Sequence, residues 1–156
     1  MSIRQTVPFE TTLHVRDTCI CLHLQRAARM IARRFDESLR PAGLTNGQFS
    51  LLMALNRPQP PTIGGVAALL AMDRTTLTAS LKPLERRGLL RITVDPEDRR
   101  SRRLTLTPAG QAALSAALPL WRQEHAAIDL RLEDPDRLRG DLLALSAAEP
   151  PAPQDR

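Results

Sequence analysis

The sequence predicts a mainly α-helical fold with one small β-hairpin. Apolar residues recur every three or four positions along most of the 156 residues, which is the period of an amphipathic helix. The period changes to two in segments 89–94 and 103–107, which indicates strands. Residues that cap helices stand directly before several of the helical segments. The length suits one domain with its own core.

The first long helix is expected over residues 17–40. Residues 1–14 before it show no clear period, and we expect them to form a flexible arm. Asp17 and Thr18 are candidates to cap the start of the helix. Its apolar stripe consists of Ile20, Leu24, Ala27, Ile31, Phe35 and Leu39.

Three shorter helices are expected next, each starting at a polar residue. Thr45 and Gln48 have the spacing of a capping box at the first of them. Thr62 and Asp73 are the expected caps of the second and third. The three segments are 44–57, 62–72 and 73–88.

Two strands, 89–94 and 103–107, follow these helices and are joined by the loop DPEDRRSRR. Leu90 and Ile92 share one face of the first strand, and Leu104 and Leu106 share one face of the second. The pattern predicts a long hairpin with a strongly basic tip.

Two further helices are expected at the carboxyl end of the chain. Each begins with a cap followed by proline, Thr107 with Pro108 and Asp134 with Pro135. Residues 149–156 are rich in proline and polar residues, and we expect a disordered tail there. The expected buried stripes are Leu114, Leu118, Trp121, His125, Ile128 and Leu132 in the first helix, and Leu138, Leu142 and Leu145 in the second.

The charge of the chain is strongly positive and comes almost wholly from arginine. The net charge is +5, the isoelectric point is about 10.8, and Lys82 is the only lysine. Arginine presents a flat fork of donors that suits phosphates and guanine edges. A basic protein can bind nucleic acid or an acidic membrane, or can simply be soluble. The sequence has no apolar run long enough to span a bilayer and no signal segment, so we expect a cytoplasmic protein without a membrane partner.

Two short helices followed by a basic hairpin are the element order of a winged helix-turn-helix. In that geometry the second helix lies in the major groove of DNA. Alternatively, segment 73–88 is an ordinary surface helix with solvated charges. The candidate DNA contacts on this recognition helix are Arg74, Thr75, Thr76, Thr78 and Lys82.

The loop between the strands supplies the other candidate contacts. A thin loop of arginines can enter the minor groove, where the negative potential is concentrated. Alternatively, the loop is solvated and its arginines are partly neutralised by nearby acidic residues. The candidate wing residues are Asp98, Arg99, Arg100, Arg102 and Arg103.

Three segments resemble the MarR family of bacterial transcriptional regulators: GLTNGQFSLLMAL, VAALLAMDRTTLTASLKPLERRGLLR and DPEDRRSRRLTLTPAGQ. The resemblance implies a domain over 15–148, with dimerisation helices at about 17–40 and 108–148 and a DNA-binding region at about 44–107. It implies homodimers in which the first and last helices interleave. It also implies that Asp98 and Arg100 brace the wing tip and that Arg100 or Arg102 enters the minor groove.

A dimer also follows from the apolar pattern itself. Two long apolar-striped helices at opposite ends of the chain would leave apolar surface exposed in a monomer. A two-fold dimer would bury that surface and set two recognition helices about one DNA turn apart. We therefore expect a near-palindromic operator in double-stranded DNA.

Cys19 and Cys21 are candidates for redox sensing. Two positions apart on one helix, they would point to nearly opposite sides and would not easily bond to each other. By resemblance, Cys21 falls where the OhrR-like, peroxide-sensing branch of the family carries its reactive cysteine. That branch supports the cysteine with tyrosines, and this chain has none. Alternatively, Cys21 is a small buried hydrophobic residue.

Arg29 and Arg33 are candidates to hold an anionic effector, since many MarR-like proteins bind small aromatic ligands between the dimerisation helices and the winged helix. Alternatively, these arginines form salt bridges. Cys19, Cys21 and His23 offer too few ligands for zinc, so we expect no metal and no cofactor.

These observations predict a homodimeric, sequence-specific DNA-binding regulator, a repressor released by a small-molecule or oxidant signal. We find no phosphate-binding glycine loop and no set of nucleophile, base and acid, so we do not expect an enzyme. The alternative is a winged-helix module for protein interaction or dimerisation that does not bind DNA.

Overall fold

The computed structural model describes residues 6–147. It is mainly helical with one two-stranded antiparallel hairpin, as the sequence predicts. The elements in chain order are α1 Phe9–Thr18, α2 Ile20–Leu39, a 3-10 turn Arg40–Ala42, α3 Asn46–Leu55, α4 Ile63–Leu69, α5 Arg74–Arg86, β1 Leu90–Val94, β2 Arg102–Leu106, α6 Pro108–Asp129 and α7 Pro135–Ser146.

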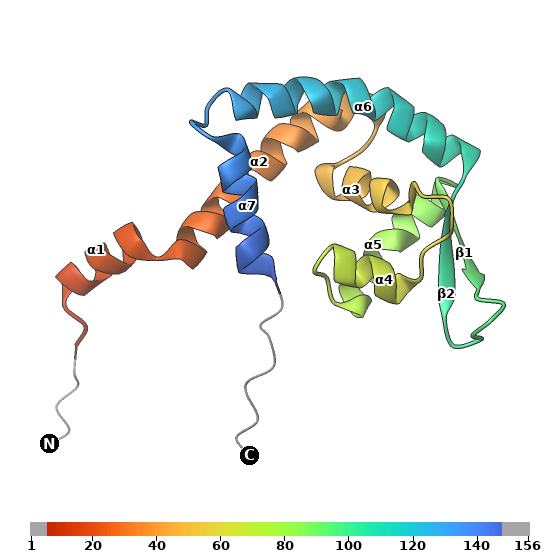
Figure 1. The fold of residues 1–156 in the computed structure, drawn as a ribbon, viewed down its shortest axis with the longest axis horizontal. Helices are drawn as coiled ribbons and strands as arrows, with labels where there is room; N and C mark the ends of the chain where they lie inside the picture. The colour runs from red at the N-terminus through yellow and green to blue at the C-terminus, as the bar shows by residue number, and fades with distance from the viewer. Residues whose placement is uncertain (1–5, 148–156) are drawn as a thin grey trace, which may run out of the picture.

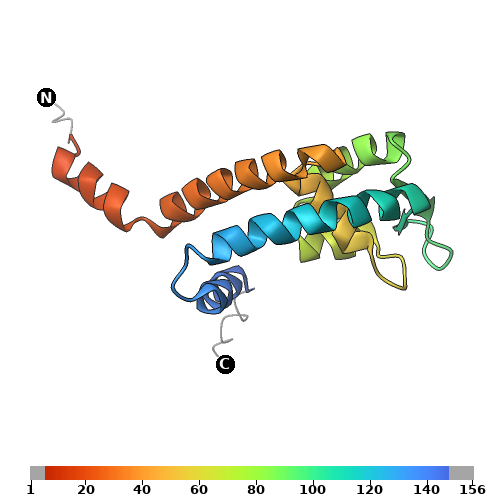
Figure 2. The ribbon, with the colours of Figure 1, turned by 90° about the horizontal axis from the view of Figure 1, so that it is seen from above.

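The two longest helices, α2 and α6, lie side by side and run in opposite directions (Figures 1 and 2). Helices α3, α4 and α5 pack together beneath one end of this pair, and the hairpin projects from the same end (Figure 1). Helices α1 and α7 lie toward the other end, away from the hairpin (Figure 1). The fold thus separates a winged helix-turn-helix from a helical arm.

The core is rich in leucine and joins the winged helix to the long helices. Phe35 and Leu39 of α2 pack in the same buried cluster as α3, α5 and α6. Burying side chains of this size contributes about 1.5–3 kcal/mol each. The fully buried side chains are Leu39, Leu52, Val66, Leu77, Leu81, Leu84 and Leu104.

The predicted caps of the central elements are confirmed. Thr45 and Gln48 form the capping box of α3, and Thr62, Asp73 and Thr107 each accept a hydrogen bond from the backbone of the first turn they precede. Gly88 follows α5 in the left-handed conformation, with φ +69°, as predicted for the end of that helix. The two strands of the predicted hairpin pair from Leu90↔Leu106 to Val94↔Arg102.

The start of the chain differs from the prediction. Residues 9–14, expected in the flexible arm, belong to α1. Helix α1 buries no residue, so it has no core-facing stripe that the sequence could reveal. The rest of that prediction, residues 1–5, and the predicted tail at 149–156 lie outside the described residues.

The cap of α2 also differs. Cys19, with extended backbone, precedes the helix, and its Sγ accepts a hydrogen bond from the backbone of Leu22. Asp17 and Thr18, the predicted caps, are the last two residues of α1 instead. The Asp17 carboxylate pairs with Arg16, and the Thr18 hydroxyl donates to the carbonyl of His14. The chain is therefore divided into two helices at Cys19.

The last helix, α7, exposes the leucines that were expected to face inward. In this single chain 40% of Leu138, 38% of Leu142 and 60% of Leu145 are exposed. The stripe exists, but within residues 6–147 the same chain covers it only in part, and none of its residues is buried. No helix in this range is long and apolar enough to cross a lipid bilayer.

Candidate nucleic-acid interface

The first turn of α5 is held by its cap. The Asp73 carboxylate accepts the backbone N–H of Thr76 at 2.8 Å and the hydroxyl of Thr76 at 2.6 Å. The hydrogen bond from that hydroxyl, followed by backbone N–H groups, lowers the pKa of Asp73 below its usual value. Ala71, with φ 51° in the left-handed region, lies in the tight turn that connects α4 to α5.

One side of α5 forms a shallow hollow of about 340 Å³. The opposite side carries Leu77, Leu81 and Leu84, which are wholly buried and fix the rotation of the helix. The residues that line the hollow are Arg74, Thr75, Thr78, Ala79 and Lys82.

The prediction for α5 therefore needs one correction and one addition. Thr76 lies off this side of the helix, and its hydroxyl is bound to Asp73, so its role is in the cap. Ala79 lies on the side and was missed because it carries no polar group. The spacing of positions 74, 75, 78 and 82 already indicated it.

Arg74 lies across the start of α4. A Cβ atom at Gly64 would come within 3.0 Å of the Arg74 guanidinium, so glycine leaves room for this arginine there. The guanidinium remains exposed at the edge of the helix-turn-helix. That position suits a contact with the DNA backbone or a base edge next to the hollow.

The wing tip is built by Asp98. Its carboxylate accepts the backbone N–H of Arg100 at 2.9 Å, and its carbonyl accepts the N–H of Ser101 at 2.9 Å. Asp98 thus braces the tip through the backbone of Arg100, the residue with which the resemblance grouped it. Among the described residues, no side-chain partner is found for the exposed guanidinium groups of Arg99 and Arg100.

Arg102 and Arg103 have different surroundings. The guanidinium of Arg102 is exposed and donates to the carbonyls of Arg99 and Ser101, both at 3.1 Å. Arg103 is half-buried, and its Nε donates to Oδ2 of Asp95 at 2.7 Å. Its Nη1 donates to the carbonyl of Pro60 at 3.0 Å.

The structure thus holds Arg103 at the base of the wing, unlike the exposed arginines of the tip, and its contact with DNA stays a prediction. Its partner Asp95 is only 3% exposed and also accepts the backbone N–H of Glu97 at 3.0 Å. Hydrogen bonds from that N–H and from Arg103 lower the pKa of Asp95 below its usual value. The alternative of neutralisation by nearby acidic residues applies to Arg103, but the sequence could not single it out because the fourth arginine of the loop looks like the other three.

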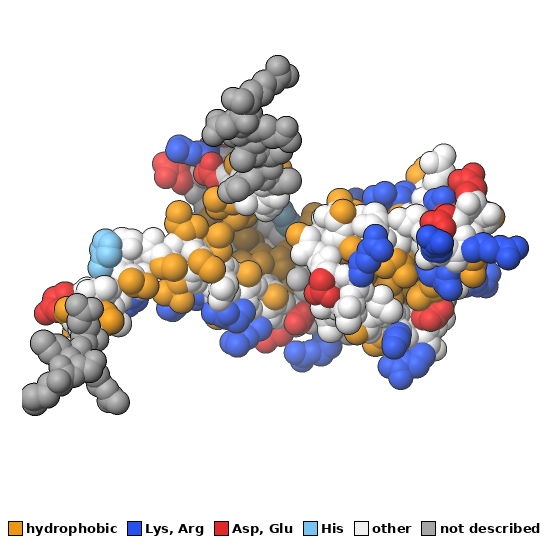
Figure 3. All heavy atoms as spheres, turned by 90° about the horizontal axis from the view of Figure 1, so that it is seen from below, with side chains coloured by type: hydrophobic (Ala, Val, Ile, Leu, Met, Phe, Trp, Pro, Cys, Tyr) orange, Lys and Arg blue, Asp and Glu red, His pale blue; other side chains and the backbone are white. Residues whose placement is uncertain are grey.

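Cationic side chains gather over the winged helix, and apolar side chains gather over the opposite end of the molecule (Figure 3). The exposed cations at the winged-helix end include those of α5 and the wing tip. Arginines also lie along the helical arm, so the two ends differ in the balance of exposed apolar and cationic side chains and not in one kind alone (Figure 3).

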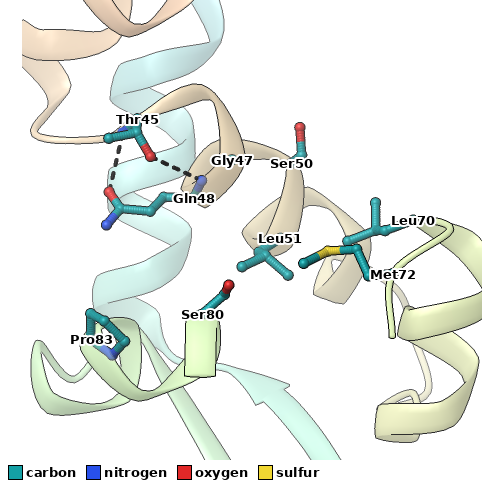
Figure 4. Close-up of a pocket in the computed structure, with 9 residues that line it drawn as sticks. All are labelled: Thr45, Gly47, Gln48, Ser50, Leu51, Leu70, Met72, Ser80 and Pro83. Atoms are coloured by element: carbon teal, nitrogen blue, oxygen red, sulfur yellow. Dashed lines mark hydrogen bonds between the residues drawn. The ribbon is translucent and has the colours of Figure 1, made fainter. Parts of the chain in front are cut away.

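A second hollow, of about 440 Å³, lies between α3, the turn from α4 to α5, and α5 (Figure 4). It has an apolar floor and hydroxyl groups at its edge, and none of its lining residues is charged. Arg29 and Arg33, the predicted effector contacts, lie on α2 and do not line it. The lining residues are Thr45, Gly47, Gln48, Ser50, Leu51, Leu70, Met72, Ser80 and Pro83.

The ion pairs between α2 and α6 and between α6 and α7 were not predicted. Arg34 of α2 pairs with Glu124 of α6 at 2.6 Å, and Arg139 of α7 binds the carboxylate of Asp129. Within the described chain, neither Arg29 nor Arg33 forms a salt bridge. His125 packs half-buried against Trp121, with ring centroids 4.7 Å apart, as expected for a residue of the core.

The two cysteines stand at the junction of α1 and α2. Cys19 is half-buried at the cap, and Cys21 is exposed, with the amide of Gln25 3.2 Å from its Sγ. The argument that both cysteines lie on one helix is therefore wrong, because Cys19 precedes α2. His23 is hydrogen-bonded to the Cys19 carbonyl, and no metal-binding group of three or more His, Cys, Asp or Glu occurs within residues 6–147.

This arrangement of α3, α4, α5 and wing is shared with known regulators. The model of the MarR family matches residues 42–101, from the start of the helix-turn-helix region to the wing. The transcriptional regulator MosR of Mycobacterium tuberculosis, solved in complex with DNA, has 40% sequence identity and a TM-score of 0.77. The match covers 82% of this chain and 93% of that one. The chain belongs to the MarR family.

Two other MarR-like relatives show the range of the likeness. BpsR of Bordetella bronchiseptica, whose DNA binding is regulated by 6-hydroxynicotinic acid, has 28% identity and a TM-score of 0.73, over 85% of this chain and 96% of that one. The transcriptional activatory protein BadR of Rhodopseudomonas palustris is 33% identical over 56% of this chain. The aligned part spans about half of BadR, 52% of its length. As a MarR-family member, this protein is a DNA-binding transcriptional regulator and not an enzyme.

Proposed function

We propose that this protein is a homodimeric, sequence-specific repressor that binds a near-palindromic operator in double-stranded DNA. The observation that carries the proposal is the grouping of the α5 hollow and the basic wing at one end of the fold. The DNA complex of MosR, at 40% identity, supports it. A repressor of this kind works on the bacterial chromosome, which places it in the cytoplasm.

The proposed DNA contacts follow from the free donors. The hollow side of α5 enters the major groove, and the wing tip reaches the minor groove with Arg99, Arg100 and Arg102. Asp98 holds the tip in shape. Arg103 supports the wing from below, bound to Asp95.

Salt-dependent DNA binding tests this proposal. Each phosphate contact releases counterions, so replacing Arg99 and Arg100 by alanine should lower the slope of log affinity against log salt by about 1 per lost contact. Arg122→Ala, at an exposed position of α6 away from the wing, is the matched control and should keep the slope. Fluorescence anisotropy on the selected operator measures both.

The alternative is a winged-helix module that binds another protein and not DNA. It predicts that purified protein shows no salt-sensitive affinity for any duplex, and that the wing variants behave like Arg122→Ala. The exposed guanidinium groups of Arg99 and Arg100 favour DNA, because a duplex is the commonest partner that needs cations at the tip of a thin loop.

A homodimer accounts for the apolar end of the molecule. The exposed apolar residues there belong to α1 and α2, near the start of the chain, and to α7, near its end. A stable dimer needs a self-complementary patch of this kind. The large apolar side chains that are exposed include Phe9, Val15, Ile20, Leu22, Leu24, Met30, Leu138, Leu142, Leu143 and Leu145.

A small-molecule effector is part of the proposal. The hollow of Figure 4 touches both α3 and α5, so an occupant would change how the recognition helix sits on its support. Its uncharged lining favours a neutral compound, whereas Arg29 and Arg33 favour an anionic one. A panel of neutral and anionic aromatic compounds, tested for release of operator DNA, distinguishes the two. Leu51→Trp, which fills the hollow, should abolish the response to a neutral effector, and Arg33→Ala, which removes a cation, should weaken the response to an anionic one.

An oxidant is the other proposed signal. Cys21 is exposed, and Cys19 is the residue between α1 and α2. Oxidation of either cysteine would therefore change the junction of the two helices. Peroxide should then release DNA from the native protein but not from Cys21→Ser. If Cys19→Ser and Cys21→Ser both respond like the native protein, the oxidant proposal is wrong.

A further inference from the structure

The hollow side of α5 has an apolar centre between two cations. Arg74 and Lys82 stand at its ends, eight residues and about 12 Å apart along the helix axis. Thr75, Thr78 and Ala79 lie between them, with Thr75 next to Arg74 and with Thr78 and Ala79 at the centre. The side that faces a DNA groove is therefore not polar throughout, although the sequence of this helix looks rich in hydroxyl groups.

The hydroxyl groups of α5 are mostly bound within the helix. The Thr78 hydroxyl donates its proton to the carbonyl of Arg74 at 2.7 Å, one turn earlier. The Thr76 hydroxyl is bound to Asp73, and the Ser80 hydroxyl donates to the carbonyl of Thr76 at 2.9 Å. The Thr78 hydroxyl therefore has no proton left to donate to a base, and its methyl group is the branch that does not take part in this bond.

Ala79 extends the same apolar surface. It is exposed, lines the hollow beside Thr78, and has a methyl group as its whole side chain. Two methyl groups on neighbouring residues make a small patch that can bury apolar surface but cannot satisfy a base donor or acceptor. A polar base edge pressed against this patch would lose its hydrogen bonds to water.

In the major groove, thymine is the base that presents a methyl group. Cytosine has only hydrogen at that carbon and offers an amino donor beside it, and purines offer acceptors or an amino group. A methyl patch therefore discriminates for thymine both by burying its 5-methyl group and by leaving the other bases unsatisfied. Arg74 and Lys82 are free to bind the phosphates or guanine edges on either side.

We propose that Thr78 and Ala79 make α5 a reader of thymine 5-methyl groups, so that each operator half-site carries thymine at the centre of the contacted bases. This inference rests on the proposed function and specifies the DNA chemistry that the same site recognises. The observation that carries it is the bond between the Thr78 hydroxyl and the Arg74 carbonyl, together with the exposed methyl of Ala79.

Replacing single thymines by uracil tests the proposal on the DNA side, because the change removes the methyl group and keeps the base pairing. The duplex is first selected from random sequence with the purified full chain. One or two thymines in each half-site should then lose about fourfold in affinity per methyl removed. Uracil in the flanking sequence is the control and should have no effect.

A pair of variants tests it on the protein side. Thr78→Val keeps the shape and removes the hydroxyl, so it should retain the preference for thymine over uracil. Thr78→Ser keeps the hydroxyl and removes the methyl, so it should lose that preference by about fourfold. Thermal unfolding of both variants checks that they fold, and binding to a non-operator duplex should stay the same in all forms.

The outcomes separate this inference from the proposed function. If no sequence is enriched and no salt-dependent binding is found, the proposed function fails and the inference fails with it. If an operator is enriched but uracil replaces thymine everywhere without loss, only the inference fails. If Thr78→Val loses the preference and Thr78→Ser keeps it, the hydroxyl reads the base and the methyl model is wrong.

Discussion

Whether an arginine of the wing is exposed or held in an ion pair depends on its individual neighbours. The loop holds four arginines within five positions, and nothing in their spacing distinguishes them. The structure binds Arg103 to Asp95 across the hairpin and leaves Arg99 and Arg100 exposed. A pair of this kind depends on the register of the strands and on the approach of Pro60, which is a tertiary contact that a sequence pattern does not contain.

Asp95→Asn gives a prediction at this scale. If Arg103 contacted DNA, removing the negative charge of Asp95 would strengthen DNA binding. Because Arg103 is bound to Asp95, we expect the opposite: the wing base loosens and operator affinity falls at least about threefold, the size of one lost charge-assisted hydrogen bond at partial exposure. Anisotropy titrations measure this. An unchanged or higher affinity would contradict the role given to Arg103.

The same pair has a pH dependence with a definite sign. The pKa of Asp95 is lowered in the folded protein, so its contribution to folding stability is complete above the ordinary carboxyl pKa. That contribution is lost as the pH falls through the lowered pKa, where the carboxylate accepts a proton. We therefore expect the difference in thermal stability between the native protein and Asp95→Asn to be present at neutral pH and to shrink in acid. A difference that stays constant down to the acid range would show that the charge of Asp95 is not its source.

At the scale of elements, much of the fold was predictable because local chemistry fixes helix ends. The caps at Thr45, Thr62, Asp73 and Thr107 were predicted, and each is present. Helix α1 was not predicted, because none of its residues is buried within the described chain and it has no apolar stripe facing a core. On α5 the interior stripe was predicted correctly. Which of its threonines takes part in the cap and which lies on the surface depends on side-chain hydrogen bonds that the sequence pattern does not contain.

Gly110 gives the prediction for an element. The first turn of α6 packs so closely on the end of β1 that a Cβ atom at this position would lie 2.0 Å from the carbonyl oxygen of Leu89. Because that neighbour is backbone, Gly110→Ala should force α6 away from the hairpin and destabilise the fold by about 2–4 kcal/mol. Chemical denaturation measures the free energy of unfolding.

Gly140→Ala in α7 is the matched control. A Cβ atom there meets nothing within 4 Å, so alanine should stabilise the helix by about 0.5–1 kcal/mol. Equal effects of the two substitutions would mean that the close approach at Gly110 does not limit the packing of α6.

At the scale of the whole molecule, one end of the chain carries the winged helix and the other end exposes apolar side chains of α1, α2 and α7. The leucines of α7 were predicted to be buried, and in one chain they are not. The pattern identified the residues of the stripe, but the described part of this chain covers them only in part, and the proposed dimer would complete their burial. An apolar stripe in a sequence indicates burial and does not say whether the burial is within a subunit or between subunits.

The dimer is therefore the prediction that belongs to the whole molecule. Leu142→Glu and Leu145→Glu place charge on the exposed side of α7, and a charge buried without a partner costs several kcal/mol, which weakens a dimer by at least about a hundredfold. Sedimentation should show monomers for these variants, and operator affinity should fall because two half-sites are no longer bound together. Leu69→Glu, at a residue of α4 that is 59% exposed, is the control and should leave the dimer intact. If the α7 variants remain dimeric with unchanged DNA affinity, the apolar end serves another partner and the two-fold operator model is wrong.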